Sequence, residues 1–572
     1  MAVFYIDEEK GSDAAGTAGA ESAPFKTLSQ AFLEHGPDNE YLVKKKDDEE
    51  YKPAAKAALK KAVNFVATHR KKQEAAAARA EKEAQDKAAR EAVLEKAKDL
   101  KITEDSSLPK PVRISLDETD VNIIGTLRKS GSEGGDGKAV RVVVQGRVQR
   151  VAKQGGLIFV WLRRGMTRMQ CVLTGDLSKT YDALVLVRET ALEITGELWE
   201  LPPGTHAPLS RELRADFFRV IAAAPGGDDA LITRVPETHD ATSSQASEAQ
   251  LNLRHLYLRH DKPSAVIYVR SVVERAFQTA YHELGVTKVS PPALVQTQVE
   301  GGSTLFSLDY YGQPAYLTQS SQLYLETLLP SLGDVYCIEK SFRAEKSLTR
   351  RHLSEYTHVE AELDFISFDD LLTHLEKLIS RVVDLVLEDP HAAATIKEYN
   401  KDFKKPTMPF KRMRYSEAIK WLQERGIKNE EGEDHKIGDD IAEAAERLMT
   451  DEINECIMLT HFPAHIKAFY MQRAGEEDGV TVTESVDILM PGVGEIVGGS
   501  MRIWDFEELM AAYKEEGLDP APYYWYTDQR KYGSSPHGGF GLGLERFLAW
   551  LLKLWTVREA CLYPRYMNRC TP

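Results

Sequence analysis

The sequence predicts a multidomain protein of the α+β class, and three observations support this prediction. With 572 residues the chain is longer than one hydrophobic core usually supports, so two or three domains are expected. Residues 121–224 contain short stretches of alternating polar and apolar residues, which are typical of a small β-barrel. Residues 251–572 mix helical periodicity with apolar strands, which indicates an antiparallel sheet flanked by helices.

The composition limits the possible partners of the protein and the compartment in which it is expected. The formal net charge is -15, so an RNA partner would require local basic patches rather than a positive charge over the whole molecule. The five cysteines are scattered and form no CxxC pair, which favours free thiols in a reducing compartment and argues against a zinc site. No apolar run reaches membrane-spanning length, and the N-terminus lacks a signal or transit pattern. We therefore expect a cytoplasmic protein whose partners include neither a membrane nor DNA.

Residues 1–68 form the first predicted unit. Val3–Ile6 is a candidate strand, a loop rich in Gly, Ala and Ser follows it, and Phe25–Phe32 is the next apolar segment. A small α+β unit and a poorly ordered tail both agree with this pattern, so the two alternatives stay open.

Residues 69–110 are predicted to form a long charged helix and its linker. From Lys71 to about Lys101 the chain consists almost entirely of strong helix formers, with opposite charges four residues apart and almost no apolar stripe. A solvated single helix is therefore expected, and Pro109 and Pro111 end it. The helix is either a spacer or an arm whose basic side chains contact RNA phosphates.

Residues 121–224 are predicted to form a five-stranded barrel of the OB type. The candidate strands are Val140–Arg150, Leu157–Arg163, Met169–Leu173 and Ala191–Leu198. Barrels of this type bind single-stranded nucleic acid by aromatic stacking and polar contacts to base edges. The candidate RNA-binding side chains are Phe159, Gln170, Arg147 and Arg150. An aromatic residue at such a place is more often part of the barrel core, so Phe159 by itself does not decide the matter.

A polar hinge is predicted at 225–250, and the largest domain at 251–572. Within it, Ser264–Leu284 has the periodicity of a helix, Val286–Leu294 is a strand ended by prolines, and residues 366–390 predict an amphipathic helix. Residues 398–470 are rich in charge and are predicted to be a helical insertion, for which the sequence indicates no function.

The central stretch of this domain runs from Phe342 to Glu362. Two strand candidates, Val335–Ile338 and Tyr356–Val359, enclose a loop that carries five basic side chains: Arg343, Lys346, Arg350, Arg351 and His352. An antiparallel hairpin with a cationic loop can hold several phosphates, because arginine grips an oxyanion with two parallel hydrogen bonds. Tyr356 offers an aromatic face for a base. The alternative is an ordinary solvated loop.

Polar groups elsewhere in the domain predict the rest of a pocket. Glu300 stands beside two glycines, and Ser320 and Gln322 lie at the start of a helix. Asp487 and Glu495 are carboxylates on neighbouring strand candidates that could share Mg²⁺ over a triphosphate. Further polar candidates are Glu360 and Arg502, and Gly498 permits a close backbone approach.

A glycine-rich strand, Gly538–Gly543, runs into an apolar helix that begins near Arg546. The segment does not match GxGxxG and no βαβ unit surrounds it, so a dinucleotide-binding fold is not predicted.

These segments together resemble the class II aminoacyl-tRNA synthetases of the aspartyl, asparaginyl and lysyl subgroup. Phe342–Glu362 resembles their motif 2, and Gly538–Leu552 resembles motif 3. Ser264–Leu294, with Pro292, resembles motif 1, the dimer element. The resemblance covers about residue 121 to the end and implies the class II catalytic fold, a homodimer through motif 1, ATP as a substrate, Mg²⁺ and a tRNA partner. It also makes 1–110 similar to the extensions of eukaryotic cytosolic members.

The resemblance also implies roles for single residues. Arg343 and Arg546 would be catalytic, stabilising phosphoryl charge. The implied ATP-binding residues are Arg343, Glu345, His352, Leu353, Tyr356, Glu495, Gly543 and Arg546. The implied amino-acid-binding residues are Glu300, Ser320, Gln322, Arg343, Glu360, Gly498 and Arg502. Mg²⁺ would lie on Asp487 and Glu495, and the tRNA would contact Lys346, Ser347 and Thr349 as well as the four barrel residues.

Leu325 separates two members of the subgroup. Aspartyl enzymes carry a lysine at the matching position, where its ammonium pairs with the substrate carboxylate. Without that cation an aspartate side chain would lack part of its counter-charge, while Arg502 can still donate to an amide carbonyl. The resemblance therefore favours L-asparagine and tRNA(Asn) as substrates, joined through an adenylate.

Several alternatives stay open on the sequence alone. The nearest is an aspartyl enzyme of relaxed tRNA choice. An ammonia-dependent asparagine synthetase would share the catalytic fold but would not need the barrel, and a catalytically inactive RNA-binding or signalling protein would not need Arg343, His352, Glu495 and Arg546. The N-terminal extension could add an RNA-binding or signalling role to the enzyme.

Overall fold

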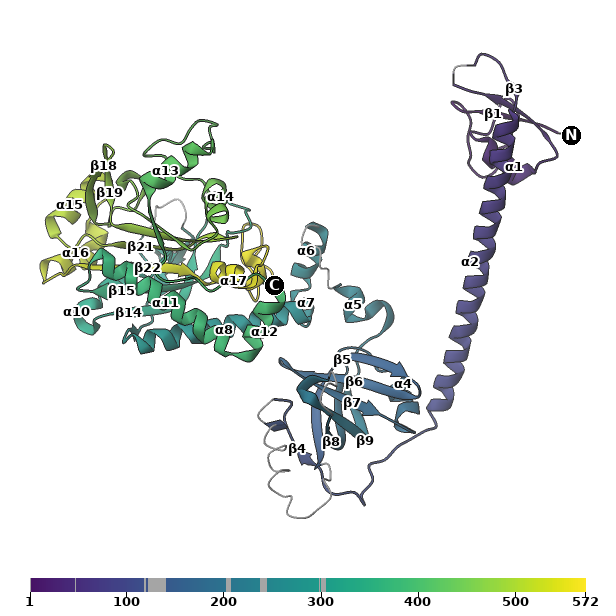
Figure 1. Cartoon of the computed structure of the whole chain (residues 1–572), viewed down its shortest axis with the longest axis horizontal. Coiled ribbons are helices and arrows are strands. Elements are labelled where there is room, and N and C mark those ends of the chain that lie inside the picture. Colours follow the sequence, from purple (N-terminus) through teal and green to yellow (C-terminus); the bar gives the residue numbers. More distant parts are fainter. Residues whose placement is uncertain are drawn as a thin grey trace. The chain divides into compact units, whose positions relative to one another are not determined.

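The computed structural model describes residues 2–46, 48–117, 120–121, 140–201, 207–236, 244–297, 299 and 305–572. The chain divides into two compact units. The first comprises residues 1–162 and 169–223, and the second comprises residues 163–168 and 224–572. Figure 1 labels the helices and strands of both units.

The N-terminal residues form an ordered α+β unit rather than a tail. Strand β1 (Val3–Asp7) pairs in parallel with β2 (Glu40–Lys44), and β3 (Lys52–Pro53) pairs antiparallel to β2. Helix α1 (Leu28–His35) begins at Thr27, whose side chain accepts a hydrogen bond from the Gln30 N–H. The buried core of this unit consists of Ile6, Phe25, Ala31, Phe32, Tyr41 and Ala62.

Helix α2 (Lys56–Ala97) has 42 residues and begins earlier than the predicted charged segment. Its first turns belong to the small N-terminal core, where Ala62 is buried and Leu59 and Val66 pack beside it. Most described side chains from 67 to 96 are exposed. The apolar contacts of the first turns explain why the helix begins at Lys56, before the charge-rich segment.

A closed five-stranded barrel follows, as predicted. Its strands are β5 (Val140–Gln154), β6 (Leu157–Arg164), β7 (Thr167–Leu173), β8 (Ala191–Glu200) and β9 (Arg211–Ala222). The order is β5-β6-β7-β9-β8, and β8 pairs back to β5. The β7–β9 pair is parallel, and the short strand β4 (Val112–Arg113) adds to β5 at the outside. Inward positions of the strands form one apolar core, which includes Val142, Val144, Leu162, Met169 and Ile194.

The second unit is built on an eight-stranded sheet of order β10-β14-β15-β22-β21-β20-β17-β16. The bounds are β10 (Thr287–Lys288), β14 (Val335–Phe342), β15 (Glu355–Asp364), β22 (His537–Gly543), β21 (Gly494–Met501), β20 (Ser485–Met490), β17 (Ile457–Thr460) and β16 (Lys411–Arg414). The prediction of an antiparallel sheet holds for the middle strands. The outermost pairs, β10–β14 and β16–β17, are parallel.

Helices α8 (Asp261–Glu283), α11 (Phe368–Glu388) and α17 (Leu544–Leu552) pack against the sheet and form the largest apolar core with it (Figure 1). The alternation of β15 decides which face they cover. Val359, Ala361 and Leu363 belong to this core, so the residues between them point to the opposite face. Helix α11 confirms the amphipathic helix predicted at 366–390 and begins at a capping box of Ser367 and Asp370.

The prediction of a helical insertion at 398–470 is wrong in part. Helices α13 (Tyr415–Glu424) and α14 (Glu443–Ile453) are present, but β16 and β17 from the same segment complete one edge of the main sheet. Each of these strands has four residues, which is too short for a clear period-two pattern among so many charges.

The remaining elements frame the site. Strands β11 (Leu294–Val295), β13 (Gln313–Leu317) and β12 (Ser307–Tyr310) form a small sheet, and α9 (Gln322–Glu326) follows it. Helix α16 (Tyr524–Lys531) precedes β22. Among the helices of the described residues, none combines the length and the apolar character that crossing a bilayer requires.

Replacement of Phe547 by alanine tests the packing of α17. The ring is fully buried and makes edge contacts with Phe277 and Trp550 at centroid distances of 5.5 and 5.4 Å. Because the cavity left behind would not collapse, Phe547→Ala is expected to destabilise the second unit by about 3–5 kcal/mol, measured by denaturant unfolding. Phe365→Ala, at a ring that is 80% exposed, should change stability by less than about 0.5 kcal/mol. Equal effects of the two changes would contradict this packing.

Candidate active site

A cavity of about 940 Å³ opens over the polar face of the sheet. Strands β15, β20, β21 and β22 line it, together with the loop after β14 and the segment 465–471. The predicted residues that the structure brings to this one cavity are Ser320, Gln322, Arg343, Glu345, His352, Leu353, Tyr356, Glu360, Asp487, Glu495, Gly498, Arg502, Gly543 and Arg546. Residues up to 226 positions apart in the sequence therefore meet in one site.

The predicted hairpin is present: β14 and β15 pair antiparallel, with Phe342 opposite Glu355. Arg343 follows β14 directly, and its guanidinium lies 5.6 Å from the ring centroid of Tyr356 on the neighbouring strand. Its Nη1 lies 4.0 Å from Oε1 of Glu345. The backbone N–H of Arg343 donates to the Ser354 carbonyl at 3.0 Å. The arginine is therefore held at the cavity wall from both strands of the hairpin.

His352 is held by contacts with other residues of the basic loop. The hydroxyls of Ser347 and Thr349 lie 3.0 and 2.6 Å from Nδ1, and Nε2 lies 3.7 Å from Glu345 Oε2. Burial lowers the pKa of His352, and the nearby cations Arg546 and Arg351 add to this against the opposite effect of Glu345. The imidazole is therefore better suited to donate a hydrogen bond from Nε2 than to supply a positive charge.

Arg546, at the start of α17, is bound to Glu495 on β21. Its Nη1 donates to the Glu495 carboxylate at 3.0 Å and to the Glu495 backbone carbonyl at 3.1 Å, and Arg351 donates to the same carbonyl at 3.1 Å. Burial by itself would raise the pKa of Glu495, but Arg546, Lys467 and Arg351 lower it to about 2. Glu495 therefore stays ionised between two arginines of the cavity wall.

Asp487 and Glu495 approach each other over Gly498. A methyl group added at Gly498 would lie 3.4 Å from Glu495 Oε1 and 3.6 Å from Asp487 Oδ1, so both carboxylates face one small space. Burial raises the pKa of Asp487 to about 6, although the Lys467 ammonium lies 2.7 Å away and opposes this rise. Two carboxylate oxygen donors beside a cavity fit Mg²⁺, which typically takes one or two carboxylates together with substrate phosphates.

Helix α14 brings two carboxylates that the sequence did not predict for the site. Glu446 Oε1 accepts a hydrogen bond from the Glu495 N–H at 2.9 Å, and Glu443 lies 3.4 Å from Arg351. Burial, followed by the charge of Glu495, raises the pKa of Glu446 to about 7. The segment without a predicted function thus supports the end of the cavity that holds Glu495 and Arg351. No short pattern in the sequence marks Glu446 or Lys467, because only the fold brings them beside β21.

The opposite end of the cavity is lined by the alternate residues of β15. Glu360 accepts hydrogen bonds from the hydroxyl of Ser320 at 2.5 Å and from the Ser321 N–H at 3.0 Å. His358 Nδ1 lies 3.2 Å from Glu360. These contacts fix the Glu360 carboxylate beside the start of α9, where the polar helix start had been predicted.

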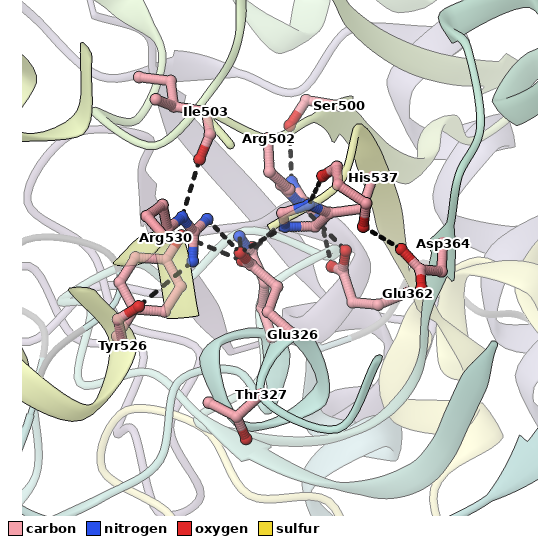
Figure 2. A network of polar contacts seen from close by, with 12 residues as sticks. Glu326, Thr327, Glu362, Asp364, Ser500, Arg502, Ile503, Tyr526, Arg530 and His537 are labelled. Carbon is pink, nitrogen blue, oxygen red and sulfur yellow. Dashed lines mark hydrogen bonds and ion pairs between the residues drawn. The ribbon is translucent and has the colours of Figure 1, made fainter. Parts of the chain in front are cut away.

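Arg502 lies at the same end and is bound to Glu362 (Figure 2). Its Nη2 donates to Glu362 Oε1 at 2.5 Å, and its Nη1 donates to the Ser500 hydroxyl at 2.5 Å. Burial raises the pKa of Glu362 to about 7 against the opposing charge of Arg502. A guanidinium donor and a carboxyl acceptor therefore stand next to each other at the cavity wall.

Leu325 and Glu300 are the last two residues predicted for amino-acid recognition. Leu325 is fully buried in a small apolar cluster with Leu329, Val335 and Cys337 and is absent from the lining. Its predicted effect on specificity therefore rests on the apolar character of this position, where aspartyl enzymes carry a lysine, and stays a prediction. Glu300 lies outside the described residues.

Two glycines of β22 leave space for side chains of the neighbouring strand β15. A methyl group at Gly541 would come within 2.2 Å of His358 Nε2, and one at Gly539 within 2.3 Å of the Glu362 carboxylate. These two glycines therefore leave room for two polar side chains of β15.

The predicted RNA-binding side chains of the barrel lie on its outer positions. Phe159 is half-buried and contacts Trp161 at a ring distance of 6.3 Å, and the guanidinium of Arg150 lies 5.2 Å from the Trp161 ring. The Gln170 amide donates to Glu212 at 2.8 Å. Arg147 is exposed. Trp161 was not predicted, although its place two residues after Phe159 puts both rings on the same side of β6.

The sequence also matches known proteins. Residues 246–567 match the family model described as tRNA synthetases class II (D, K and N), and residues 20–109 match the model described as the asparaginal-tRNA synthetase N-terminal domain. A relative from Homo sapiens named "Asparagine--tRNA ligase, cytoplasmic" is 48% identical over 577 aligned positions, which cover 100% of both chains. One of the same name from Debaryomyces hansenii is 50% identical, also over 100% of both chains.

The chain belongs to the asparaginyl group of class II tRNA synthetases. A solved structure of asparaginyl-tRNA synthetase from Entamoeba histolytica, described as a complex with asparaginyl-adenylate, agrees with this. It is 44% identical, with a TM-score of 0.71, and the match covers 81% of this chain and 100% of that one. The predicted family is therefore confirmed, and the asparaginyl prediction is favoured over the aspartyl alternative.

Glu446→Gln tests the buried carboxylate of α14 by its pH dependence. The pKa of Glu446 is raised from 4.5 to about 7, so the folded state disfavours the ionised form and loses stability as pH rises from about 4.5 to 7. The amide cannot ionise, so at pH 8 the variant should be more stable than the wild type by about 1–3 kcal/mol. At pH 5 the gain should vanish. Calorimetric unfolding midpoints at the two pH values measure this difference.

Glu452→Gln on the exposed side of the same helix is the matched control, and its effect should not grow with pH. A pH-independent shift of Glu446→Gln would rule out a raised pKa.

Gly541→Ala tests the close approach of β22 to β15. The new methyl group would displace the His358 ring, which contacts both Ser341 and Glu360. We expect the KM for the amino acid to rise by roughly 10-fold or more, because displacing a group that positions the substrate typically lowers activity by such a factor. Gly543→Ala, where the nearest atom would lie at 3.7 Å, should raise the KM for the amino acid less at saturating ATP; a larger rise in this KM than in Gly541→Ala would refute the argument.

Proposed function

We propose that the cavity joins L-asparagine to tRNA(Asn) in two steps, with ATP consumed and AMP and pyrophosphate released. In the first step the asparagine carboxylate attacks the α-phosphate of ATP. In the second, the adenylate is transferred to the terminal ribose of the tRNA. The observation that carries the proposal is that Arg343 and Arg546 line one cavity whose other end holds Glu360, Glu362 and Arg502.

Positioning and charge stabilisation suffice for the first step. Arg343 would contact both the α-phosphate and the substrate carboxylate, since its guanidinium presents donors on two edges. Arg546 and His352 would hold the γ-phosphate end, while Tyr356 and Arg546 enclose the adenine. These donors oppose the negative charge that develops at phosphorus, so no protein nucleophile is required.

Mg²⁺ would be held by Asp487 and Glu495, together with phosphate oxygens, and would supply charge neutralisation for the triphosphate. Lys467 keeps Asp487 paired at 2.7 Å, and Arg546 keeps Glu495 paired at 3.0 Å. These partners hold both carboxylates in place beside the phosphates. Glu345 and Leu353 would complete the adenine side, and the backbone at Gly543 would lie against the nucleotide.

At the other end, Glu360 would receive the substrate ammonium, with Ser320, Gln322, Glu300 and Gly498 around it. The side-chain amide suits the pair of Arg502 and Glu362, which lie 2.5 Å apart. A carboxamide has one acceptor and one donor, so it can accept from the arginine and donate to the glutamate. An aspartate carboxylate has no donor for Glu362.

The tRNA would contact both units. On the barrel, Phe159 would stack on an anticodon base, Gln170 would read its edge, and Arg147 and Arg150 would contact phosphates. At the cavity, Lys346, Ser347 and Thr349 lie on the loop after β14 and would meet the acceptor end. Helix α2 would add phosphate contacts or serve as a spacer. The family also supports a homodimer formed through α8 and the strand that follows it, and a cytoplasmic location.

ATP–pyrophosphate exchange with purified protein tests the proposal. Asparagine should support exchange far better than aspartate, and unfractionated tRNA should be charged with asparagine. Arg343→Gln should lower kcat/KM for exchange by roughly 100- to 1000-fold, the loss typical for one preorganised donor at a developing charge.

Arg381→Gln serves as a matched control, because Arg381 forms an exposed pair with Glu283 at 2.7 Å and does not line the cavity. Its activity should equal that of the wild type. Preference for aspartate, or full activity of Arg343→Gln, would contradict the proposed function.

A further inference from the structure

Behind the amide end of the cavity lies a second layer of buried charge, centred on Glu326 (Figure 2). Glu326 ends α9, its side chain is 0% exposed, and it is not among the lining residues. Four side chains lie within hydrogen-bond distance of its carboxylate: Arg530 at 2.7 Å, His537 at 2.9 Å, Gln322 at 3.0 Å and Tyr526 at 3.2 Å. A carboxylate with so many partners is fixed in one position and remains available as a charge.

Glu326 also reaches the cavity wall electrostatically. Arg502 Nε lies 4.0 Å from Glu326 Oε1, while Nη2 of the same arginine lies 2.5 Å from Glu362. Arg502 is thus shared between two carboxylates, one in the wall and one behind it. Arg530 has its side chain 0% exposed and is paired with Glu326 alone among the ion pairs of the described residues.

The ionisation of the two carboxylates differs. Burial opposes charge on Glu326, but Arg530, His537 and Arg502 together lower its pKa below the ordinary value. For Glu362 burial prevails and raises the pKa to about 7. Glu326 is therefore the more constant negative charge of the cluster, which also contains Arg502, Arg530 and His537, the last with its other ring nitrogen 2.7 Å from the Ser535 carbonyl.

A buried site tolerates little unmatched charge, because the low dielectric makes each uncompensated ion costly. A neutral carboxamide adds no charge to this cluster. A carboxylate adds one negative charge. The nearby cations stabilise that charge only to the extent that other carboxylates do not already neutralise them. The charge behind the wall therefore bears on which side chain the cavity accepts.

We propose that Glu326 is a specificity-determining positioning residue: without touching the substrate, it neutralises Arg530 and part of Arg502, so that the cavity presents no surplus of positive charge to an acidic side chain. This inference rests on the proposed function and assigns the choice of amide over acid to a residue outside the pocket. It also gives a reason for the network of Figure 2, in which two arginines from separate elements converge on one carboxylate.

The proposal predicts opposite effects for the two members of the rear ion pair. Glu326→Gln leaves the shape nearly unchanged and removes a negative charge, so the ratio of kcat/KM for asparagine to that for aspartate should fall by roughly 10- to 100-fold. Arg530→Gln removes a positive charge, so the ratio should rise, because the KM for aspartate should increase more than the KM for asparagine. The double variant should return toward the wild-type ratio. ATP–pyrophosphate exchange with each amino acid measures all three.

A purely structural role would lower both activities together and would leave the ratio unchanged. Glu376→Gln, at another buried carboxylate that does not line the cavity, is the matched control and should not change the ratio. Thermal unfolding shows whether each variant is folded. If Glu326→Gln does not fold, the test rests on Arg530→Gln, for which the ratio must rise. An unchanged ratio in Glu326→Gln, or shifts of equal sign in both variants, overturns the inference. A wild-type preference for aspartate would instead overturn the proposed function.

Discussion

Strand β15 separates apolar from charged side chains residue by residue, and the catalytic unit depends on this separation. Val359, Ala361 and Leu363 enter the core beneath α8 and α11, while His358, Glu360 and Glu362 line the cavity. Because successive side chains of a strand point to opposite faces, the same residues that bury the sheet also place two carboxylates at fixed intervals above it. A shift of register by one residue would bury the carboxylates and expose the core.

The second constraint is the compensation of buried charge. At one end of the cavity, Glu495 lies between Arg546 and Arg351, and Lys467 pairs with Asp487. At the other end, Arg502 and Arg530 are matched by Glu362 and Glu326. Each of these groups would be unfavourable in the interior without its partner. The pairs hold the donors of the site in place before a substrate arrives, which is the condition for electrostatic catalysis.

Much of this site could be predicted from the sequence, because its parts are local. The basic loop between two strands and the arginine at the start of an apolar helix are each contained in about twenty residues, and the structure brings them into one cavity. Phe159 and Gln170 lie in short strands of the barrel that the alternation predicted, and their contact with RNA stays a prediction. Contacts between distant segments could not be predicted in this way. The effect of Leu325 on specificity stays a prediction, and the fold packs this side chain against Val335 and Cys337.

The same reason explains the other omissions. Strands β16 and β17 have four residues each. The pairing of β17 with β20, and of the edge strand β16 with β17, gives them a stability that their own composition does not indicate. Lys467 and Glu446 carry no pattern that separates them from other charged residues, yet they lie at 2.7 and 2.9 Å from the acidic pair of the site. The glycines of β22 were recognised, but the side chains that require them belong to a strand nearly two hundred residues earlier in the chain.

The sequence by itself determined the family and the residue types that line the candidate site, because each follows from composition, periodicity or a motif within one segment. The tertiary structure alone decided which charges are paired, which glycines make room for which side chains, and that Glu326 stands behind Arg502. Those facts depend on distances between segments that are remote in the chain, and a buried charge acts through its distance to its partners rather than through its place in the sequence.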